Sequence, residues 1–144
     1  MNRPKMVFVA HPISGDVENN CRRVLEICRQ IHTKEVIPVF PRFTWSKYLG
    51  DSPEDKELAI AVNEAYFRSG AVDELWVYGD ELSEGMRREI QLAFELGIKV
   101  VPMSEIVAHD IVAMRGRYRT ESLVLGGGIL AGSPDPEGRR LIHD

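Results

Sequence analysis

The chain has 144 residues, of which 44% are hydrophobic and 28% are charged, and its formal net charge is −4 at pH 7. This length and composition predict a single domain with a core large enough to fold alone. The negative charge argues against a nucleic-acid partner, whose binding requires a basic surface, and no segment has the apolar length of a membrane span.

The N-terminal residues MNRPK lead directly into an apolar run without a signal-peptide pattern, so we expect a cytoplasmic protein. Cys21 and Cys28 are seven residues apart on one face of a predicted helix, which is too far for a disulfide bond. No further cysteine offers a zinc site. We therefore expect neither a bound metal nor a cofactor, and both cysteines are predicted to be small core residues.

Residues 6–10 (MVFVA) form a continuous apolar run, which is typical of a parallel strand that is buried on both faces. The loop HPISGD follows this strand and leads into a helix. We expect the buried stripe of this helix to consist of Val17, Cys21, Val24, Leu25, Cys28 and Ile31. Residues 36–39 form the second predicted strand.

The loop from Phe40 to Asp51 is longer than most connections in compact α/β domains, and it carries several aromatic residues. Loops of this kind either cover a ligand or pack against a neighbouring subunit. Ser52 is predicted to cap the next helix, with Pro53 at its first position and Asp55 placed for a capping contact. The residues of this helix that should face the core are Leu58, Ala61, Val62 and Ala65.

Residues 75–102 form a predicted strand-helix-strand unit. Its elements are a strand at residues 75–78, a turn with Gly79 and Asp80, a helix that opens at Ser83, and a strand at residues 98–101. On a helical wheel the apolar residues of the helix fill one arc and most of its charged residues fill the other. Glu89 falls inside the apolar arc, where a carboxylate is costly to bury unless it is paired or protonated.

Two interpretations of Glu89 are open. It is either a structural acid bonded to a neighbouring group or a functional residue. In an open parallel α/β sheet, ligands bind outside the carboxyl ends of the strands, where helix N-termini present free N–H groups. The turn after Tyr78 lies at such an edge, and Ser83 followed by Gly85 lets a ligand approach the first helical turn. This position favours the functional interpretation.

The pattern is weaker after Pro102. Ser104 is predicted to cap a short helix that ends at Met114, residues 115–120 (RGRYRT) should form a turn-like connection, and residues 123–130 (LVLGGGIL) a strand broken by glycines. The three glycines lack the GxxxxGK[ST] pattern of a phosphate-binding loop. We therefore divide the chain into an α/β domain, residues 1–118, and a Gly- and Pro-rich C-terminal extension, residues 119–144.

The alternating elements predict a three-layer α/β sandwich of the Rossmann-like or flavodoxin-like type, with a parallel four- or five-stranded sheet. We expect the strand order 2-1-3-4, with a fifth strand contributed by the C-terminal extension. In this order the first and third strands are neighbours at the switch point, so the loops HPISGD and GDELSEG should face one another across a crevice.

Residues 7–16 (VFVAHPISGD) and 73–101 resemble the nucleoside 2-deoxyribosyltransferase-like superfamily, which includes nucleotide N-glycoside hydrolases. The most specific part of the resemblance is Ser83, Gly85 and Glu89 at the start of the helix. It implies that Glu89 is the nucleophile that attacks the anomeric carbon of the sugar and that Ser83 holds the 5′ end of the ligand. The further residues that we expect to bind the ligand are Phe8, His11, Ser14, Gly15, Asp80 and Gly85.

Three positions depart from the pattern of the superfamily. Phe8 lies where catalytic members have a tyrosine, and a phenylalanine cannot form a hydrogen bond to the nucleophile. Ser14 lies where nucleotide hydrolases have an arginine. A second catalytic aspartate falls by simple offset at Ala65, with Asn63 and Glu64 nearby. These departures indicate chemistry that is rearranged, weak or lost.

His11 is an additional loop residue with two open interpretations, either an acid, base or phosphate donor or a turn residue bonded to the backbone. A hydroxyl and free N–H groups at the helix N-terminus favour an anion, so a 5′-phosphate is expected to bind better than a 5′-hydroxyl. The acidic residues Asp80, Glu81 and Glu84 in the same turn oppose this preference.

The expected activity is hydrolysis or transfer of the base of a nucleoside or nucleoside 5′-monophosphate. A carboxylate under the anomeric carbon can stabilise the oxocarbenium-like transition state or form a glycosyl intermediate. The apolar surroundings of Glu89 should raise its pKa. The alternative function is a non-catalytic nucleotide-binding module on the same fold. The aromatic loop and the Gly-rich tail offer more apolar surface than a small monomer exposes, so we expect a homodimer or a higher homo-oligomer.

Overall fold

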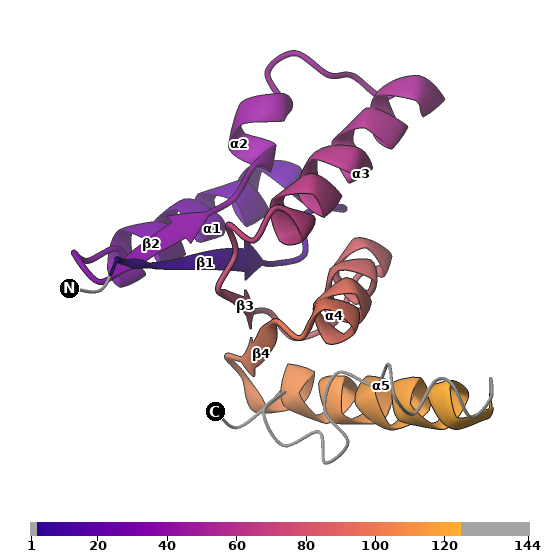
Figure 1. The fold of residues 1–144 in the computed structure, drawn as a ribbon. Helices are drawn as coiled ribbons and strands as arrows, with labels where there is room; N and C mark the ends of the chain where they lie inside the picture. The colour runs from indigo at the N-terminus through magenta and orange to yellow at the C-terminus, as the bar shows by residue number, and fades with distance from the viewer. Residues whose placement is uncertain (1–2, 125–144) are drawn as a thin grey trace.

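A computed structural model describes residues 3–124, in which strands and helices alternate along the chain (Figure 1). The elements are β1 (Lys5–Ala10), α1 (Val17–Ile31), β2 (Val36–Val39), α2 (Arg42–Trp45), α3 (Pro53–Arg68), β3 (Glu74–Val77), α4 (Glu84–Leu96), β4 (Lys99–Pro102) and α5 (Glu105–Val124). The four predicted strands and the predicted starts of α3, α4 and α5 agree with these bounds to within one residue, because apolar runs and capping residues are local signals.

The described strands form one four-stranded sheet with the order β2-β1-β3-β4, and every neighbouring pair is parallel. In the register of the sheet, Phe8 lies beside Leu75, and Leu75 lies beside Val100. This topology confirms the predicted α/β class and strand order. The helical crossovers place β1 and β3 next to each other, so the segments that follow these two strands leave the same edge of the sheet.

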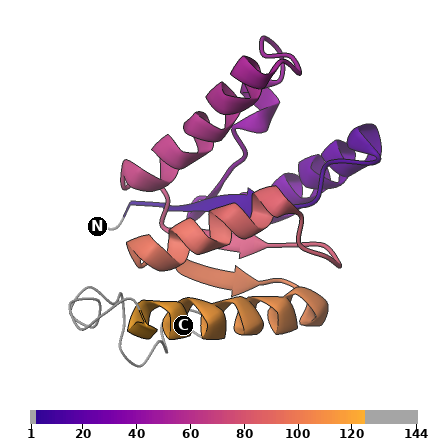
Figure 2. The ribbon, with the colours of Figure 1, turned by 90° about the vertical axis from the view of Figure 1, so that its right-hand side faces the viewer.

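Two apolar clusters cover the two faces of the sheet, because successive side chains of a strand point to opposite faces. On one face Phe8 and Leu75 pack with Ile90 of α4, in a cluster that also receives side chains from α3 and α5. On the other face Val9 packs with Val24 of α1. Figures 1 and 2 show the sheet between α1 and α4, with α5 along the β4 edge.

The predicted buried stripe of α1 is wrong at two positions. Val24 is fully buried, whereas Val17 is 48% exposed and Leu25 is 56% exposed. Leu25 is one step of about 100° from Val24 around the helix, so it points away from the sheet. Asn20 is buried in its place, and its side-chain amide donates a hydrogen bond of 3.0 Å to the carbonyl of Ile13. This bond ties the loop after β1 to α1.

The predicted core face of α3 is also wrong. Leu58, Ala61 and Ala65 are exposed, Val62 is partly buried, and the buried residue of this helix is Phe67. The capping prediction for α3 is confirmed, since the Ser52 side chain accepts a hydrogen bond of 3.1 Å from the Asp55 amide. The helix therefore starts where its sequence indicates, but it is rotated so that its apolar arc faces outward.

The long loop before α3 contains the short helix α2, and α5 continues beyond its predicted end at Met114 to Val124. The basic segment predicted as a turn is thus helical, because a single glycine is tolerated in a helix and the Tyr118 ring packs 5.7 Å from the ring of Phe94. The predicted domain boundary after residue 118 falls inside α5. The glycine run and the rest of the predicted fifth strand and C-terminal extension, residues 125–144, lie outside the described residues.

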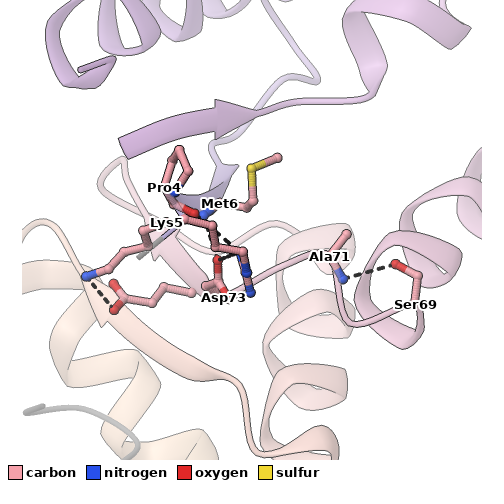
Figure 3. A network of polar contacts seen from close by, with 8 residues as sticks. Pro4, Lys5, Met6, Ser69, Ala71 and Asp73 are labelled. Carbon is pink, nitrogen blue, oxygen red and sulfur yellow. Dashed lines mark hydrogen bonds and ion pairs between the residues drawn. The ribbon is translucent and has the colours of Figure 1, made fainter. Parts of the chain in front are cut away.

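The amino ends of the strands are joined by ion pairs at the edge opposite the crevice (Figure 3). The Asp73 carboxylate accepts hydrogen bonds from the Arg3 guanidinium at 2.7 Å and from the Met6 amide at 2.7 Å. Lys5 of β1 lies 2.8 Å from the Glu74 carboxylate of β3. These contacts link the neighbouring strands β1 and β3 at their starts. Within residues 3–124, no helix is long and apolar enough to cross a membrane.

The loops after β1 and β3 meet at Gly79, which has a φ of 97°. A Cβ atom added there would lie 2.7 Å from Cδ of Pro12. We predict that Gly79→Ala lowers the free energy of unfolding by about 1–3 kcal/mol, because it adds a clash to an unfavourable backbone conformation. Urea denaturation measures this change. Gly70→Ala is the matched control, since Gly70 also has a positive φ but open space around its Cβ position, and an equal effect of both changes would exclude the clash.

Candidate active site

An open pocket of about 1030 Å³ lies at the carboxyl ends of the strands. Its lining comes from the end of β1 and the loop after it, from α2 and α3, and from α4 starting at its N-cap. The loops predicted to face one another therefore border one cavity, as expected at the switch point of a parallel sheet. A pocket of this size accommodates a small molecule such as a nucleotide.

Most of the predicted site residues line this pocket. They are Phe8, His11, Ser14, Gly15, Ser83, Gly85 and Glu89. The exception is Asp80, which lies in the turn next to Gly79 and is not part of the lining. Residues from β1, from the following loop and from α4 thus come together although they are far apart in the sequence.

The N-terminus of α4 opens into the pocket. The hydroxyl oxygen of Ser83 accepts a hydrogen bond of 3.2 Å from the Met86 amide, which confirms Ser83 as the N-cap. Its O–H group can still donate to a ligand. A Cβ atom added at Gly85 would meet no atom within 4 Å, so the first turn of the helix is open to close approach. The positive end of the helix dipole at this turn favours an anionic group.

The Glu89 side chain is mostly buried, and its Oε2 atom accepts a hydrogen bond of 3.0 Å from Nδ2 of Asn63 on α3. Burial raises the pKa of Glu89 to about 8, although the hydrogen bond from Asn63 and the charge of Arg88 act in the opposite direction. The predicted upward shift is confirmed. At neutral pH the carboxyl is therefore mainly protonated, and a positive charge in the pocket would favour its ionised form.

Asn63 is the residue of α3 that contacts Glu89, and the sequence analysis named it only as a neighbour of Ala65. Ala65, where the superfamily's second aspartate was expected, is exposed, whereas Asn63 lies on the same face of α3 as Phe67, four residues later. The Oδ1 atom of Asn63 is buried without a hydrogen-bond partner among the described residues. Rotation of the amide would let Oδ1 accept a hydrogen bond from the O–H group of the neutral carboxyl, so Asn63 can form a hydrogen bond with Glu89 in either charge state. The sequence signal that could have identified Asn63 is its position four residues before Phe67, on the same face of the helix.

Phe8 and His11 contribute differently at the end of β1. The Phe8 ring is buried and packs 4.7 Å from the ring of Phe67, so it fills space without a hydrogen bond to Glu89. The Nδ1 atom of His11 lies 2.7 Å from the carbonyl oxygen of Pro12, to which it donates when protonated. In the neutral ring this contact leaves Nε2 as an acceptor. His11 is therefore bonded to the backbone, as one interpretation expects, and it also lines the pocket.

Arg42, Trp45 and Lys56 also line the pocket and were not predicted as site residues. The Arg42 guanidinium lies 5.0 Å from the centre of the Trp45 ring, and both side chains come from α2. Neither Arg42 nor Lys56 forms one of the ion pairs found among residues 3–124. These cations supply positive charge to a pocket whose first loop has Ser14 instead of an arginine. For Arg42 and Trp45, the length and aromatic content of the loop before α3 were the available sequence signal.

One surface ion pair on α4 and the absence of a metal-binding cluster among residues 3–124 complete the description. Arg88 lies 3.7 Å from the exposed carboxylate of Glu84, one helical turn earlier, and forms a surface ion pair with it. In the described part of the chain, no group of three or more His, Cys, Asp or Glu side chains is placed to hold a metal ion. The charged residues that line the pocket are of both signs. The basic residues are Arg42, Lys56, Arg68 and Arg88, and the acidic residues besides Glu89 are Asp51, Glu64, Glu84 and Glu95.

Comparison with known proteins gives a family and a structural neighbour. The family described as Domain of unknown function (DUF7768) matches residues 5–103, which span β1 to the end of β4. No curated protein matches the chain significantly. A crystal structure of a conserved protein from Enterococcus faecalis V583 is similar with a TM-score of 0.48 and 16% sequence identity, over 97% of this chain and 82% of the other.

Proposed function

The chain belongs to the DUF7768 family, a domain of unknown function, and we propose that its pocket cleaves the N-glycosidic bond of a nucleoside or nucleoside 5′-monophosphate by hydrolysis or transfer. One observation carries this proposal. The Glu89 carboxyl lies in the pocket, bonded to Asn63 at 3.0 Å and close in sequence to the open first turn of α4. We assign this activity to cytoplasmic nucleotide metabolism.

In the proposed reaction, ionised Glu89 attacks the anomeric carbon of the sugar. The bond from this carbon to the base breaks, its electron pair leaves with the base, and a carboxylate–sugar ester forms. Water or a second base then attacks the same carbon and restores the carboxylate. Asn63 acts as a positioning residue, because its amide holds Oε2 of Glu89. The base must receive a proton as it leaves. Solvent water is one candidate donor, and His11, which lines the pocket, can donate from Nε2 when both of its ring nitrogens carry a proton.

The raised pKa of Glu89 is compatible with its role as a nucleophile, because positive charge on the sugar in the transition state favours the ionised carboxylate. At neutral pH most molecules carry a protonated Glu89, since its pKa is raised to about 8 by burial. Positive charge that develops on the sugar stabilises the ionised carboxylate, and the buried surroundings strengthen this attraction. The rate of base release should consequently rise as the pH increases towards 8.

The cations and the helix N-terminus favour a ligand with a phosphate group. We predict that a nucleoside 5′-monophosphate binds about 10–100-fold more tightly than its nucleoside in calorimetric titration, from one charge-assisted contact worth about 1.5–3 kcal/mol. Arg42→Ala should reduce this advantage, and Lys47→Ala is the control, since Lys47 is exposed and does not line the pocket. Ser83→Asp should reverse the preference by repelling the phosphate. Equal or weaker binding of the monophosphate would contradict the prediction.

A non-catalytic nucleotide-binding module is the second candidate function. It is favoured by Phe8, which offers no hydrogen bond to Glu89, and by the protonated state of Glu89 at neutral pH. Incubation with a panel of nucleosides and nucleotides, followed by chromatography for free base, separates the two functions. Release of base supports the enzyme. The binding module is supported if calorimetry shows binding but no base is released, even at a pH above the pKa of Glu89.

A further inference from the structure

Glu89 is a mostly buried acid whose hydrogen-bond partner is a neutral amide. Its Oε2 atom accepts a hydrogen bond of 3.0 Å from Nδ2 of Asn63, and Glu89 takes part in none of the ion pairs found among residues 3–124. A carboxylate withdrawn from water is strongly stabilised by a cation that reaches it. Because Glu89 lines the pocket, a cationic group of a ligand can pair with it there.

The other titratable residues of the pocket are engaged elsewhere or lie along other parts of its lining. Two arginines pair with acids on their own helices, in the ion pairs Arg68–Glu64 at 2.8 Å and Arg88–Glu84 at 3.7 Å. Lys56 precedes Asn63 by seven residues on α3, which is about 10 Å along the helix axis. The remaining titratable residues of the lining are His11, bonded to the Pro12 carbonyl, Arg42, which lies over the Trp45 ring, Asp51 and Glu95. The positive charge beside Glu89 is thus left to the ligand.

The N-terminus of α4 supplies the opposite pole of the pocket. Ser83 at the N-cap and Glu89 both line the pocket, and they are six residues apart, which is about 9 Å along the helix axis. Helical side chains tilt towards the N-terminus, so the carboxyl lies closer to the N-cap than this. A 5′-phosphate at the first turn of α4 therefore directs the sugar and the base of a nucleotide towards Glu89.

Aromatic rings border the same pocket. The rings of Phe8 and Phe67 pack 4.7 Å apart, and their low polarity strengthens the attraction between Glu89 and a cation. The Trp45 ring also lines the pocket, and the Arg42 guanidinium lies 5.0 Å from its centre. A flat cationic ring of a ligand can stack on an indole in the same way. The pocket therefore suits a base that is both aromatic and positively charged.

We propose that the ligand of this pocket is a nucleotide with a pyridinium base, whose cationic ring nitrogen pairs with Glu89. This inference rests on the proposed function, which places the anomeric carbon at Glu89, and it names the base. In a pyridinium nucleotide the charged nitrogen is bonded to the anomeric carbon. When Glu89 attacks that carbon, the electron pair of the broken bond neutralises the nitrogen, so the base leaves as an uncharged pyridine and needs no proton. Water then hydrolyses the carboxylate–sugar ester and its proton passes to solvent.

Nicotinamide mononucleotide and its reduced dihydropyridine form test the proposal in calorimetric titrations of the full chain. The two ligands share the phosphate and the sugar, and only the oxidised form has a positive charge on its base. We expect the oxidised form to bind about 10-fold more tightly or better at pH 8. Its affinity should rise about fivefold from pH 7 to pH 8, and its binding should release a proton, because the Glu89 carboxyl, with a pKa of about 8, must ionise. Titrations in buffers of different ionisation enthalpy measure this proton.

The reduced form shows how far the phosphate contributes to the pH dependence. Glu89→Gln should abolish both the preference for the oxidised form and the proton release, whereas Glu81→Gln, outside the pocket, should keep both. Equal binding of the two forms by the wild-type chain, or a preference that persists in Glu89→Gln, would overturn the proposal. Failure of both forms to bind would do the same.

Chromatography for free nicotinamide in the same samples separates this inference from the proposed cleavage. A preference for the oxidised form without release of nicotinamide supports the pyridinium ligand and contradicts the cleavage. Release of base from nucleotides with neutral bases, together with equal binding of the oxidised and reduced forms, supports the cleavage and overturns the pyridinium ligand.

Discussion

Replacing Glu89 by glutamine is expected to lower the rate of base release by about 10³-fold or more. Glutamine has the same shape and can still form a hydrogen bond with Asn63, so the pocket should keep its geometry. It cannot form the ester with the sugar and carries no negative charge to stabilise the transition state. Initial rates of base release at a pH near 8, measured by chromatography, give the size of the effect.

Glu81→Gln is the control for this experiment. Glu81 is an exposed acid in the turn before α4, and it does not line the pocket. Its substitution makes the same exchange of a carboxyl for an amide outside the pocket, so it should leave the rate unchanged. If Glu89→Gln kept the wild-type rate, Glu89 could not be the nucleophile. The functional proposal would then lose the observation that carries it.

The second large effect concerns stability. We expect the wild-type chain to lose stability as the pH rises from about 4.5 to about 8, whereas Glu89→Gln should lack this part of the loss. The pKa of Glu89 is raised from 4.5 to about 8 in the folded chain, mainly by burial. Between these values the folded state binds more protons than the unfolded state. The contribution is therefore fully present below the unfolded pKa and is lost as the pH rises through the folded pKa.

Each unit of this shift corresponds to about 1.4 kcal/mol, so the difference between wild type and Glu89→Gln should change by a few kcal/mol across the window. Urea denaturation of both proteins at about pH 5 and about pH 9 measures it. The variant should be the more stable protein at the higher pH. This outcome follows from burial alone, so it holds whether or not the pocket is catalytic.

Other groups with shifted pKa values affect the stability of the chain outside this pH window. The hydrogen bond from Arg3 lowers the pKa of Asp73, and the stability that it contributes is lost only at acidic pH. Burial raises the pKa of Tyr78 to about 12, which affects stability above the window. The exposed-acid variant Glu81→Gln should follow the wild-type curve. Parallel curves for wild type and Glu89→Gln would show that the Glu89 carboxyl is not shifted by burial.

Several features of this protein are determined by residues close together in the sequence. The apolar run MVFVA, the capping residues Ser52 and Ser83, and the alternation of strands and helices predicted a parallel α/β sandwich with the strand order 2-1-3-4. The structure confirms the α/β class and this order. The position of Glu89 in the apolar arc of its helix predicted a carboxyl with a raised pKa. These features depend on helical periodicity, strand patterning and local hydrogen bonds, which a sequence contains directly.

Only the tertiary structure decided which groups surround Glu89. Asn63 is 26 residues away in the sequence, and its hydrogen bond exists because α3 and α4 cover the same face of the sheet. Arg42 and Trp45 reach the pocket because a turn of helix forms in a loop that carries no strong periodic signal. Contacts between separate elements depend on how those elements pack, which local patterns do not specify.

The orientation of α3 shows the same limit. Its sequence determines an apolar arc, and from that arc alone Leu58, Ala61 and Ala65 were predicted to face the core. In the folded chain these residues face outward, because Phe67 and the amide of Asn63 occupy the inner face. A helical pattern specifies that one face is apolar, and it does not specify which face the packing of the other elements turns inward.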